Sequence, residues 1–467
     1  MMKNKKKEYN LFSFYDRTGI QAHLEKTASE GWMLEKIGSV FWHYRRMEPQ
    51  NLHFSVTYFP QASAFDPEPS EKQQIFRDFC KHSGWKLVAS SAQMEIYCNA
   101  AENPVPIETD ALIELENIHK TAKKTILASN IIFLVLGLLQ ICMQIINFID
   151  NPIYALSHNT TIFLVFCWSI VLITAIVELT SYYHWYKKAK TAAREEGYFV
   201  ETQSHKRFQK TLLIILFVGL AFWVFSLGFG RDLFAGLFGM VVFLLILLSV
   251  MGIKTLLKKM KVSAKVNRTI TFAASFLFSF VIMGLLVLLI LQGVLNGILK
   301  EREPYKIYEY EGWDFEIYHD ELPLRIEDLM ETDYEDYSYE KYETESIFLA
   351  EVDASQTAPH YADDMPEITY TVTKVKIPFL YNLCFDEIYH KYDDWYGDSN
   401  ASEMNDYFVE VDASPWDADV VYQRCFDGNM EENYIICYED RIVEFKLYNM
   451  SLTEEQMRIL TEKLSDI

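Results

Sequence analysis

The chain has 467 residues, of which 50% are hydrophobic and 23% are charged, and its 18 Gly, 13 Pro and 7 Cys exclude collagen-like, disordered and disulfide-scaffold classes. The net charge of −22 is unevenly distributed: residues 1–124 carry 16 basic and 16 acidic side chains, residues 125–300 carry 15 and 6, and residues 301–467 carry 12 and 43. This asymmetry indicates parts that lie in different environments, and the length allows two or three domains.

The chain begins with a basic segment, Met-Met-Lys-Asn-Lys-Lys-Lys. A cleaved signal peptide would continue with an apolar stretch, but Glu8, Tyr9 and Asn10 follow instead. The sequence therefore predicts no cleavage, and we expect membrane insertion to depend on the first apolar span, after residue 124.

Residues 1–105 predict a small cytoplasmic α+β domain with the element order βαββαβ. The expected strands cover 11–15, 32–46, 51–60 and 84–98, and the expected helices cover 19–30 and 71–82. Asp16 and Thr18 are candidate N-caps of the first helix. This order is that of the ferredoxin-like fold, which we predict for the domain.

The two halves of this domain share a short motif. Each predicted helix ends in Gly, and a Trp opens the strand that follows, at Gly31-Trp32 and at Gly84-Trp85. The repeat indicates an internal duplication. Trp32 and Trp85 could stack a ligand between them, or they could fill equivalent core positions between helix and sheet; we favour the second interpretation.

The same region resembles a known family. The residues that carry the resemblance are Phe14-Tyr15-Asp16, the helix end Ala28-Ser-Glu-Gly-Trp-Met-Leu34, and the aromatic strands Phe41-Trp-His-Tyr44 and Phe54-Ser-Val-Thr-Tyr-Phe59. They resemble the family called "domain of unknown function 2812" over roughly residues 9–120. The resemblance implies a membrane-anchored bacterial protein, often with helical spans after this domain and with genes near PadR-like transcriptional regulators. It implies no catalytic residue, because the family has no assigned activity.

Residues 106–124 predict a helical linker, and residues 125–300 predict a transmembrane region. A helix needs about 20 apolar residues to cross a hydrocarbon core. Five stretches of this kind are nearly free of charged side chains and show no polar face at helical spacing. The predicted spans lie at about 126–147, 160–180, 211–230, 233–253 and 271–295.

Basic residues in the short loops predict the orientation. They gather before the first span, in the segment 187–210 and in the segment 254–268, whereas the loops at 150–159 and 231–232 hold almost none. Because positive charge stays on the cytoplasmic side, we expect a multi-pass cell-membrane protein with a cytoplasmic N-terminus and an extracytoplasmic C-terminus. A run of aromatic side chains beside Lys187 is typical of an interfacial belt next to anionic lipid; it comprises Tyr182, Tyr183, Trp185 and Tyr186.

Residues 301–467 predict an acidic extracytoplasmic α+β domain with a mainly antiparallel sheet. A short helix is expected near 324–330, and Ser451 and Glu454 form a candidate capping box for a closing helix. The expected strands are 305–310, 313–318, 347–352, 368–377, 407–411, 420–426, 434–438 and 441–448.

This domain contains two dense groups of carboxylates, at 331–345 and at 393–398. Neither matches the EF-hand loop, so we interpret both as solvated surface. Three histidines, His319, His360 and His390, also lack the spacing of a zinc site. The sequence therefore predicts no metal site.

Cys425 and Cys437 flank a predicted hairpin turn near 427–429. An exterior domain permits a disulfide, so the sequence allows either a bridge between these two cysteines or a pair of free thiols.

The sequence contains none of the common nucleotide-binding, hydrolase, redox or metalloprotease motifs, and it predicts no catalytic, cofactor-binding or metal-binding residue. The spans lack ionisable groups at mid-depth, so transport by this chain alone is not expected. We expect a non-enzymatic envelope sensor, regulator or assembly factor that couples a cytoplasmic to an extracytoplasmic domain. Its expected partners are the lipid bilayer and a membrane or envelope protein, and not nucleic acid. The alternatives are an accessory exporter subunit or small-molecule-binding component, and an exterior hydrolase with paired carboxylates.

Overall fold

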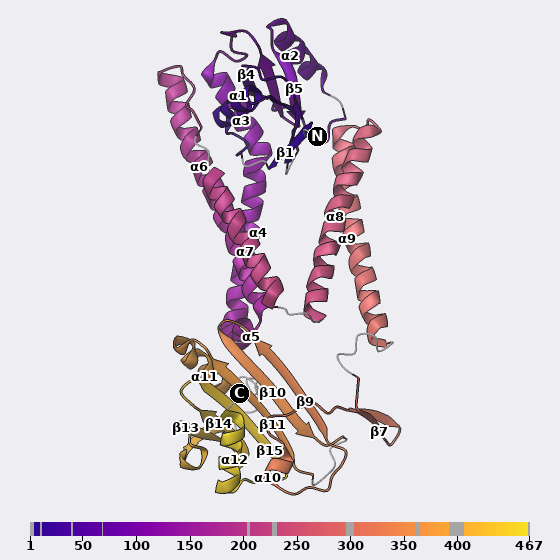
Figure 1. The fold of residues 1–467 in the computed structure, drawn as a ribbon, viewed down its shortest axis with the longest axis vertical. Helices are drawn as coiled ribbons and strands as arrows, with labels where there is room; N and C mark the ends of the chain where they lie inside the picture. The colour runs from indigo at the N-terminus through magenta and orange to yellow at the C-terminus, as the bar shows by residue number, and fades with distance from the viewer. Residues whose placement is uncertain are drawn as a thin grey trace. The chain divides into compact units, whose positions relative to one another are not determined.

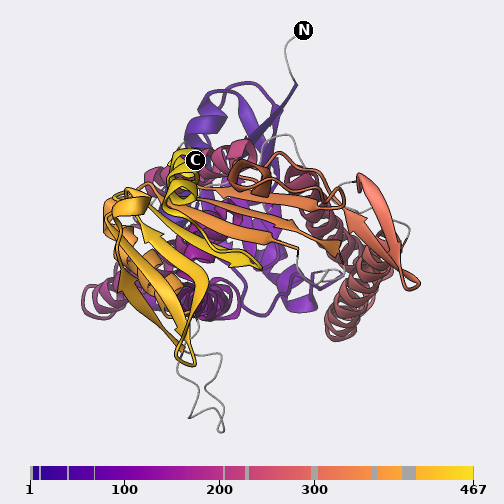
Figure 2. The same cartoon turned by 90° about the horizontal axis from the view of Figure 1, so that it is seen from below.

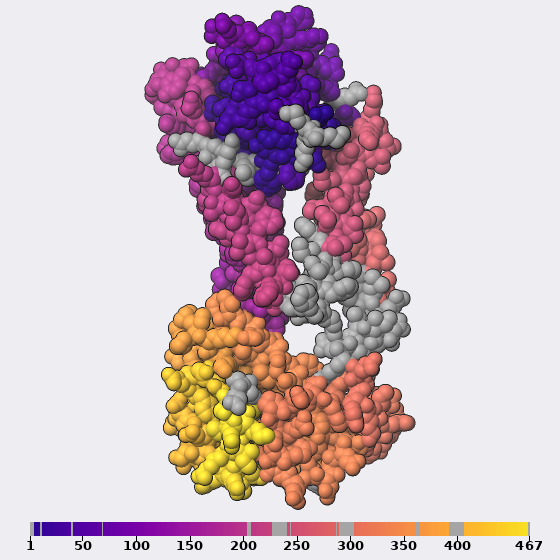
Figure 3. Space-filling model, viewed as in Figure 1, coloured from indigo at the N-terminus to yellow at the C-terminus, as the bar shows by residue number. Residues whose placement is uncertain are grey.

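The computed structural model describes residues 4–9, 12–38, 41–67, 69–202, 206–226, 231–295, 303–359, 365–391 and 406–465. Most of these residues are coloured in Figure 3. The chain divides into two compact units. The first comprises residues 1–141 and 166–289, and the second comprises residues 142–165 and 290–467.

The N-terminal domain consists of two βαββ halves (Figure 1). The first half contains β1 (Lys5–Tyr9), α1 (Arg17–Ser29), β2 (Trp32–Lys36) and β3 (Phe41–Arg46), and the second contains β4 (His53–Tyr58), α2 (Glu71–His82), β5 (Lys86–Ser91) and β6 (Met94–Asn99). The sheet orders are β1-β3-β2 and β4-β6-β5, so each half places its third strand between the other two, and all pairs are antiparallel. The duplication inferred from the sequence is thus a repeat of a whole βαββ unit.

The expected single βαββαβ sheet does not form among the described residues. The segments predicted as single strands, 32–46 and 84–98, are hairpins, and the first strand lies at Lys5–Tyr9 and not at 11–15. The second hairpin turns at Ala92-Gln93 with Ala92 at φ +50°, a conformation that usually requires Gly or Asn. Because the sequence there lacks a turn residue, the hairpin could not be recognised from its pattern.

The two helices end as the motif predicts. Gly31 and Gly84 have φ values of +84° and +85°, and each donates its backbone N–H to a carbonyl in the last helical turn, of Ala28 and of Lys81. At the start of α1, Asp16 accepts a hydrogen bond from the Gly19 backbone at 3.1 Å. This confirms Asp16, and not Thr18, as the N-cap.

Trp32 and Trp85 do not share one environment. Trp32 is half-buried at the edge of the main core, with the Arg46 guanidinium 5.0 Å from its ring centre. Trp85 is buried in a separate small cluster with Cys80 and Tyr97, and its indole N–H donates to the Val105 carbonyl at 2.8 Å. The two rings therefore serve as core residues of separate clusters.

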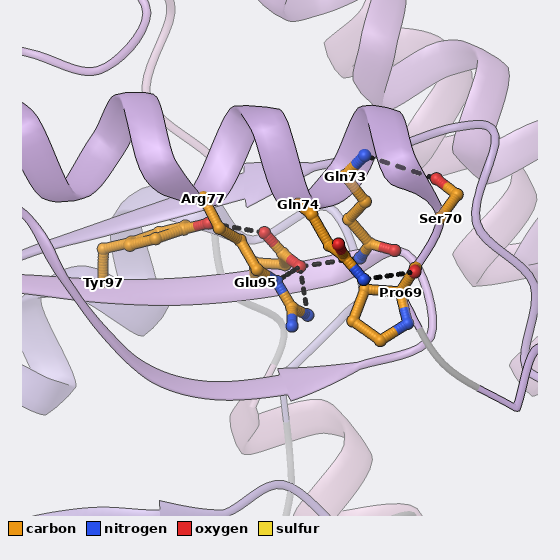
Figure 4. A network of polar contacts seen from close by, with 7 residues as sticks. All are labelled: Pro69, Ser70, Gln73, Gln74, Arg77, Glu95 and Tyr97. Carbon is orange, nitrogen blue, oxygen red and sulfur yellow. Dashed lines mark hydrogen bonds and ion pairs between the residues drawn. The ribbon is translucent and has the colours of Figure 1, made fainter.

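The second half contains a buried polar network under α2 (Figure 4). The Glu95 side chain has no exposed surface. Its Oε1 accepts from Gln73 Nε2 at 2.7 Å and from Arg77 Nε and Nη2 at 2.8 and 2.6 Å, and its Oε2 accepts from the Tyr97 hydroxyl at 2.5 Å. The core side of α2 is thus partly polar, while the apolar Ile75 and Phe79 of the same helix are 62% and 58% exposed.

A series of helices, most of them long, follows the N-terminal domain. They are α3 (Ala111–Lys124), α4 (Ile126–Asp150), the short α5 (Pro152–Ser157), α6 (Asn159–Glu195), α7 (Lys206–Ser226), α8 (Arg231–Lys259) and α9 (Ala264–Leu295). The segment predicted as a linker is the helix α3, and its Ala111, Leu115 and Ile118 belong to the N-terminal core.

Four candidate spans in the described chain are long and apolar enough to cross a membrane: 111–150, 159–195, 207–226 and 264–285. Their most apolar windows are only 6–11% buried, so apolar side chains cover their outer surfaces. An apolar surface of this extent is unfavourable in contact with water, so its exposure suggests a membrane protein. The fourth predicted span, 233–253, lies within α8, which is not among these four candidates. A count of five spans therefore stays a prediction.

The C-terminal domain is built on one antiparallel sheet of seven strands, in the order β12-β13-β14-β15-β11-β10-β9 (Figure 2). These strands are β9 (Ser338–Glu345), β10 (Leu349–Thr357), β11 (Glu367–Val375), β12 (Asp406–Val411), β13 (Val420–Phe426), β14 (Asn429–Cys437) and β15 (Arg441–Tyr448). A separate hairpin comprises β7 (Lys306–Tyr310) and β8 (Trp313–Ile317), and the helices are α10 (Ile326–Leu329), α11 (Tyr381–Tyr389) and α12 (Glu454–Ser465). The predicted antiparallel class is confirmed.

Alternate residues of this sheet face two different cores. On β14, Tyr434 and Ile436 join a cluster with Leu460 and Leu464 of α12, whereas Ile435 and Cys437 join a cluster with α11. Ile153 of α5 belongs to the second cluster. Because strand side chains alternate between faces, the sheet has α12 on one side and α11 with α5 on the other.

Several details of this domain differ from the expectations. The helix α11 was not foreseen. The capping box of α12 lies two residues later than predicted: the Gln456 backbone N–H donates to Thr453 Oγ1, and the Thr453 backbone N–H donates to Gln456 Oε1. Part of the acidic run 331–345 forms the edge strand β9, where charged side chains discourage pairing with another sheet. The acidic run 393–398 lies outside the described residues.

Cys425 and Cys437 are both free and buried. The turn at Asp427-Gly428 pairs Phe426 with Asn429, so Cys425 lies opposite Met430 while Cys437 lies opposite Val420. Because register separates the two cysteines along the hairpin, the disulfide that the sequence left open does not form.

Candidate functional site

The clearest candidate site in the first unit is a junction between the loop before α1 and the long helices. Ser13 Oγ donates to Glu178 Oε1 of α6 at 2.9 Å, and Gln209 Nε2 of α7 donates to the same oxygen at 2.6 Å. Glu178 lies near the end of the predicted span 160–180. Two uncharged donors from other elements hold this carboxylate.

A second polar group lies in the same loop. Asp16 is fully buried, and its Oδ1 accepts from the hydroxyl of Thr202 at 2.6 Å. The Thr202 backbone N–H donates to Thr18 Oγ1 at 3.0 Å. Asp16 therefore caps α1 and also ties it to the segment after α6.

Aromatic and small side chains surround these polar contacts. The Tyr15 ring lies 5.2 Å from both the Tyr182 and the Trp185 rings of α6, centre to centre. Tyr182 and Trp185 are 1% and 7% exposed, so they pack against protein and do not form the predicted interfacial belt; Tyr183, in contrast, is exposed. Burial, followed by the charges of Glu178 and Asp16, raises the pKa of the Tyr15 phenol above its ordinary value.

The helix α3 completes the junction. Arg17 of α1 forms an ion pair with Glu114 at 2.6 Å. His119 Nδ1 lies 2.7 Å from the Tyr182 hydroxyl, and the His119 ring stacks on Tyr186 at 4.0 Å. The N-terminal domain and α3 therefore contact α6 through hydrogen bonds and ring packing.

A cleft of about 440 Å³ opens beside this junction. Its lining combines aromatic rings, hydroxyls and both signs of charge, from Tyr15, Ser181, His184, Trp185, Lys188 and Glu201. Such a mixed lining can hold a small amphipathic molecule.

The C-terminal domain has its own group of carboxylates around α11, of which Glu444 is buried and Glu351 and Glu387 are partly buried. Glu387 Oε2 accepts from the Ile153 backbone at 2.6 Å, and Lys391 Nζ lies 3.0 Å from Glu444. Burial raises the pKa of Glu351 to about 7, and the carboxylates of Asp353, Glu387 and Glu444 add to the shift. Glu387 thus fastens α5, which connects α4 to α6, to α11.

Within the described ranges, no group of three or more His, Cys, Asp or Glu side chains could hold a metal ion. The His319 ring stacks on Tyr305 at 3.9 Å, and His360 lies outside those ranges. The junction residues were missed by sequence reasoning, because Ser13, Glu178 and Gln209 are far apart in the chain. Only Glu178 and Gln209 carried a signal in the sequence, as polar residues at or near a predicted span end.

Residues 16–130 match the family model described as "Protein of unknown function (DUF2812)". This confirms the resemblance for the N-terminal part of the chain. The matched range begins at the N-cap of α1 and includes α3, so it contains most of the N-terminal side of the junction. No curated protein and no solved structure gives a significant match.

Proposed function

We propose that this chain is a non-enzymatic bacterial membrane protein that couples a cytoplasmic N-terminal domain to an acidic extracytoplasmic domain, as an envelope sensor, regulator or assembly factor. One observation carries the proposal: α4 and α6 each run from one compact unit into the other. Leu127 near the start of α4 and Tyr182 of α6 belong to the N-terminal core, and the connection between these helices carries Ile153 into the C-terminal core.

The proposed topology has five spans, an inner N-terminus and an outer C-terminus. It rests on the basic loops, which gather on one side of the spans. Labelling tests it directly. Asn429 is exposed at a hairpin turn of the C-terminal domain, so Asn429→Cys in a Cys142→Ser background should react with an impermeant maleimide in intact cells. Reaction only after lysis would contradict the topology.

The junction could transmit a movement of α6 to the loop before α1. A shift or rotation of α6 would move Glu178 relative to Ser13 and Gln209, whose hydrogen bonds to it are 2.9 and 2.6 Å long. Hydrogen bonds weaken steeply with distance and angle. A displacement of the helix would therefore loosen the loop before α1.

The coupling is tested by disturbing one end and measuring the other. Ile153→Asp places a charge in the C-terminal core, where Ile153 is 6% exposed. In the full chain in lipid nanodiscs, we expect hydrogen exchange to accelerate at residues 13–18 and 199–202. The matched control is Ile307→Asp, at a residue of the same type that is 58% exposed, and it should leave that exchange unchanged. Faster exchange around α11 without any change at residues 13–18 would refute coupling.

The cleft at Tyr15 and Trp185 favours a second candidate function, a small-molecule-binding membrane component. In this case a bound molecule, and not the C-terminal domain, would set the state of the junction. Narrowing the cleft with Ser181→Trp would then abolish the effect of that molecule on hydrogen exchange at residues 13–18. The coupling proposal instead predicts that Ile153→Asp still accelerates this exchange when Ser181→Trp is present. Co-purification with an ATPase would favour the exporter-subunit alternative.

A further inference from the structure

A second cleft, of about 490 Å³, lies within the first unit between the β5–β6 hairpin and the C-terminal end of α8. Its polar lining comprises Lys254, Lys258 and Lys259 with the hydroxyls of Ser90, Ser91 and Thr255. We call it the lysine cleft. No residue of the junction lines it, so it is a separate place in the fold.

Buried contacts hold the walls of the lysine cleft together. Asn267 of α9 has no exposed surface, and its Nδ2 donates to the Phe65 carbonyl at 3.2 Å and to the Lys254 carbonyl at 3.4 Å. Thr271 Oγ1 donates to Asn267 Oδ1 at 3.1 Å. The Lys254 ammonium lies 4.9 Å from the centre of the Phe65 ring. The loop of the N-terminal domain and both helices are therefore fixed around the lysines.

The described residues place no carboxylate against the positive charge of the lysine cleft. Lys254 and Lys258 are one helical turn apart, where like charges destabilise a helix. None of the ion pairs in the described part of the chain involves these three lysines. Burial, and then the charge of Lys258, lower the pKa of Lys254. An anion in the cleft would relieve both effects.

We propose that the lysine cleft binds a phosphate group, carried either by an anionic lipid headgroup or by a phosphorylated solute. Ammonium groups and hydroxyls are the side chains that hold phosphate oxygens. Lys254 directly follows the predicted span 233–253, which places the cleft at the depth of lipid headgroups on the cytoplasmic side. The site does not depend on the coupling proposal, because it uses none of the junction residues.

Differential acetylation of lysines tests the proposal in the full chain. The protein is placed in nanodiscs of phosphatidylcholine, of phosphatidylcholine with phosphatidylglycerol, or of phosphatidylcholine with added inorganic phosphate. The acetylation rate of each lysine is read by mass spectrometry. Lys265 of α9, which is exposed and does not line the cleft, reports the general effect of an anionic surface in each sample.

We expect phosphate binding to slow acetylation of Lys254 and Lys258 about fivefold or more relative to Lys265. Protection by phosphatidylglycerol alone assigns the site to a lipid headgroup, and protection by inorganic phosphate assigns it to a soluble phosphate. Equal rates in all three samples, after division by the Lys265 rate, would overturn the proposal.

A pair of variants separates the cleft from a general basic surface. Lys254→Gln/Lys258→Gln should reduce the number of phosphatidylglycerol molecules retained per chain in detergent, measured by native mass spectrometry, if the lipid is the source. With soluble phosphate as the source, it should weaken phosphate affinity about 25-fold. Lys265→Gln/Arg268→Gln removes the same charge from the same helical hairpin and should have little effect, while Lys254→Arg/Lys258→Arg should bind. An equal loss in the two Gln variants would overturn the proposal.

Discussion

The buried Glu95 network allows a quantitative prediction about the second half of the N-terminal domain. Arg77→Leu removes two of the four hydrogen bonds to Glu95 and the cation that balances it. Breaking a buried ion pair by removing one partner costs about 3–5 kcal/mol. Arg77 is 23% exposed, and donors from Gln73 and Tyr97 remain, so we expect the lower end, about 3 kcal/mol.

Hydrogen exchange of the β6 amides in the nanodisc-embedded chain measures this cost as a local opening free energy. A loss of about 3 kcal/mol corresponds to exchange about 150-fold faster. Lys72→Leu is the control, because Lys72 is exposed on the same helix and its replacement should change stability by less than about 0.5 kcal/mol.

The unbalanced charge of Glu95 causes the loss of stability in Arg77→Leu, so neutralising Glu95 should restore part of that stability. Arg77→Leu/Glu95→Gln should open less readily than Arg77→Leu alone, by about 1 kcal/mol or more. Exchange in Arg77→Leu that matches the Lys72→Leu control, or no recovery in the double variant, would refute this reasoning.

Three further predictions concern other parts of the chain. The pKa of Glu351 is raised from 4.5 to about 7 in the folded domain. The contribution of this carboxyl group to stability is therefore full below its unfolded pKa and is lost as pH rises through about 7. The melting temperature of the C-terminal domain should fall between pH 5 and pH 8, and Glu351→Gln should flatten that fall. Gly31→Ala and Gly84→Ala should each destabilise the N-terminal domain by about 1–2 kcal/mol, because both residues have positive φ; exchange at the flanking amides measures it, and unchanged exchange would contradict it. Cys425 and Cys437 should both be alkylated after denaturation without a reductant, whereas a mass two hydrogens lower would indicate a bridge.

The sequence predicted best those elements whose signal is local. The helix over 71–82 and the strands 420–426 and 441–448 have the predicted bounds, since their periodicity and turn residues are explicit. The apolar spans were equally clear, and four candidate helices support them. The interior of the N-terminal domain was less predictable, because the turn at Ala92 lacks a turn residue and because the two halves form separate sheets.

The junction could not be predicted from the sequence for a different reason. Glu178, Ser13 and Gln209 come from three elements, and Glu178 and Ser13 are 165 positions apart, so nothing local pairs them. The aromatic run after the second span shows the same limit. Tyr182 and Trp185 have the composition of a membrane belt, but α6 continues past the apolar segment and buries them in the N-terminal core.

The docking of α5 in the C-terminal core has a consequence for how the protein is made. Ile153 belongs to a cluster that includes Ile442, about 290 positions later in the chain. At about 5–20 residues per second, roughly 15–60 s of synthesis separate the two. During that time, the short segment between the first two spans carries its apolar side chains without their partners. The nascent chain therefore needs a holding factor at this point, or it risks misassembly until the last strands of the sheet have emerged.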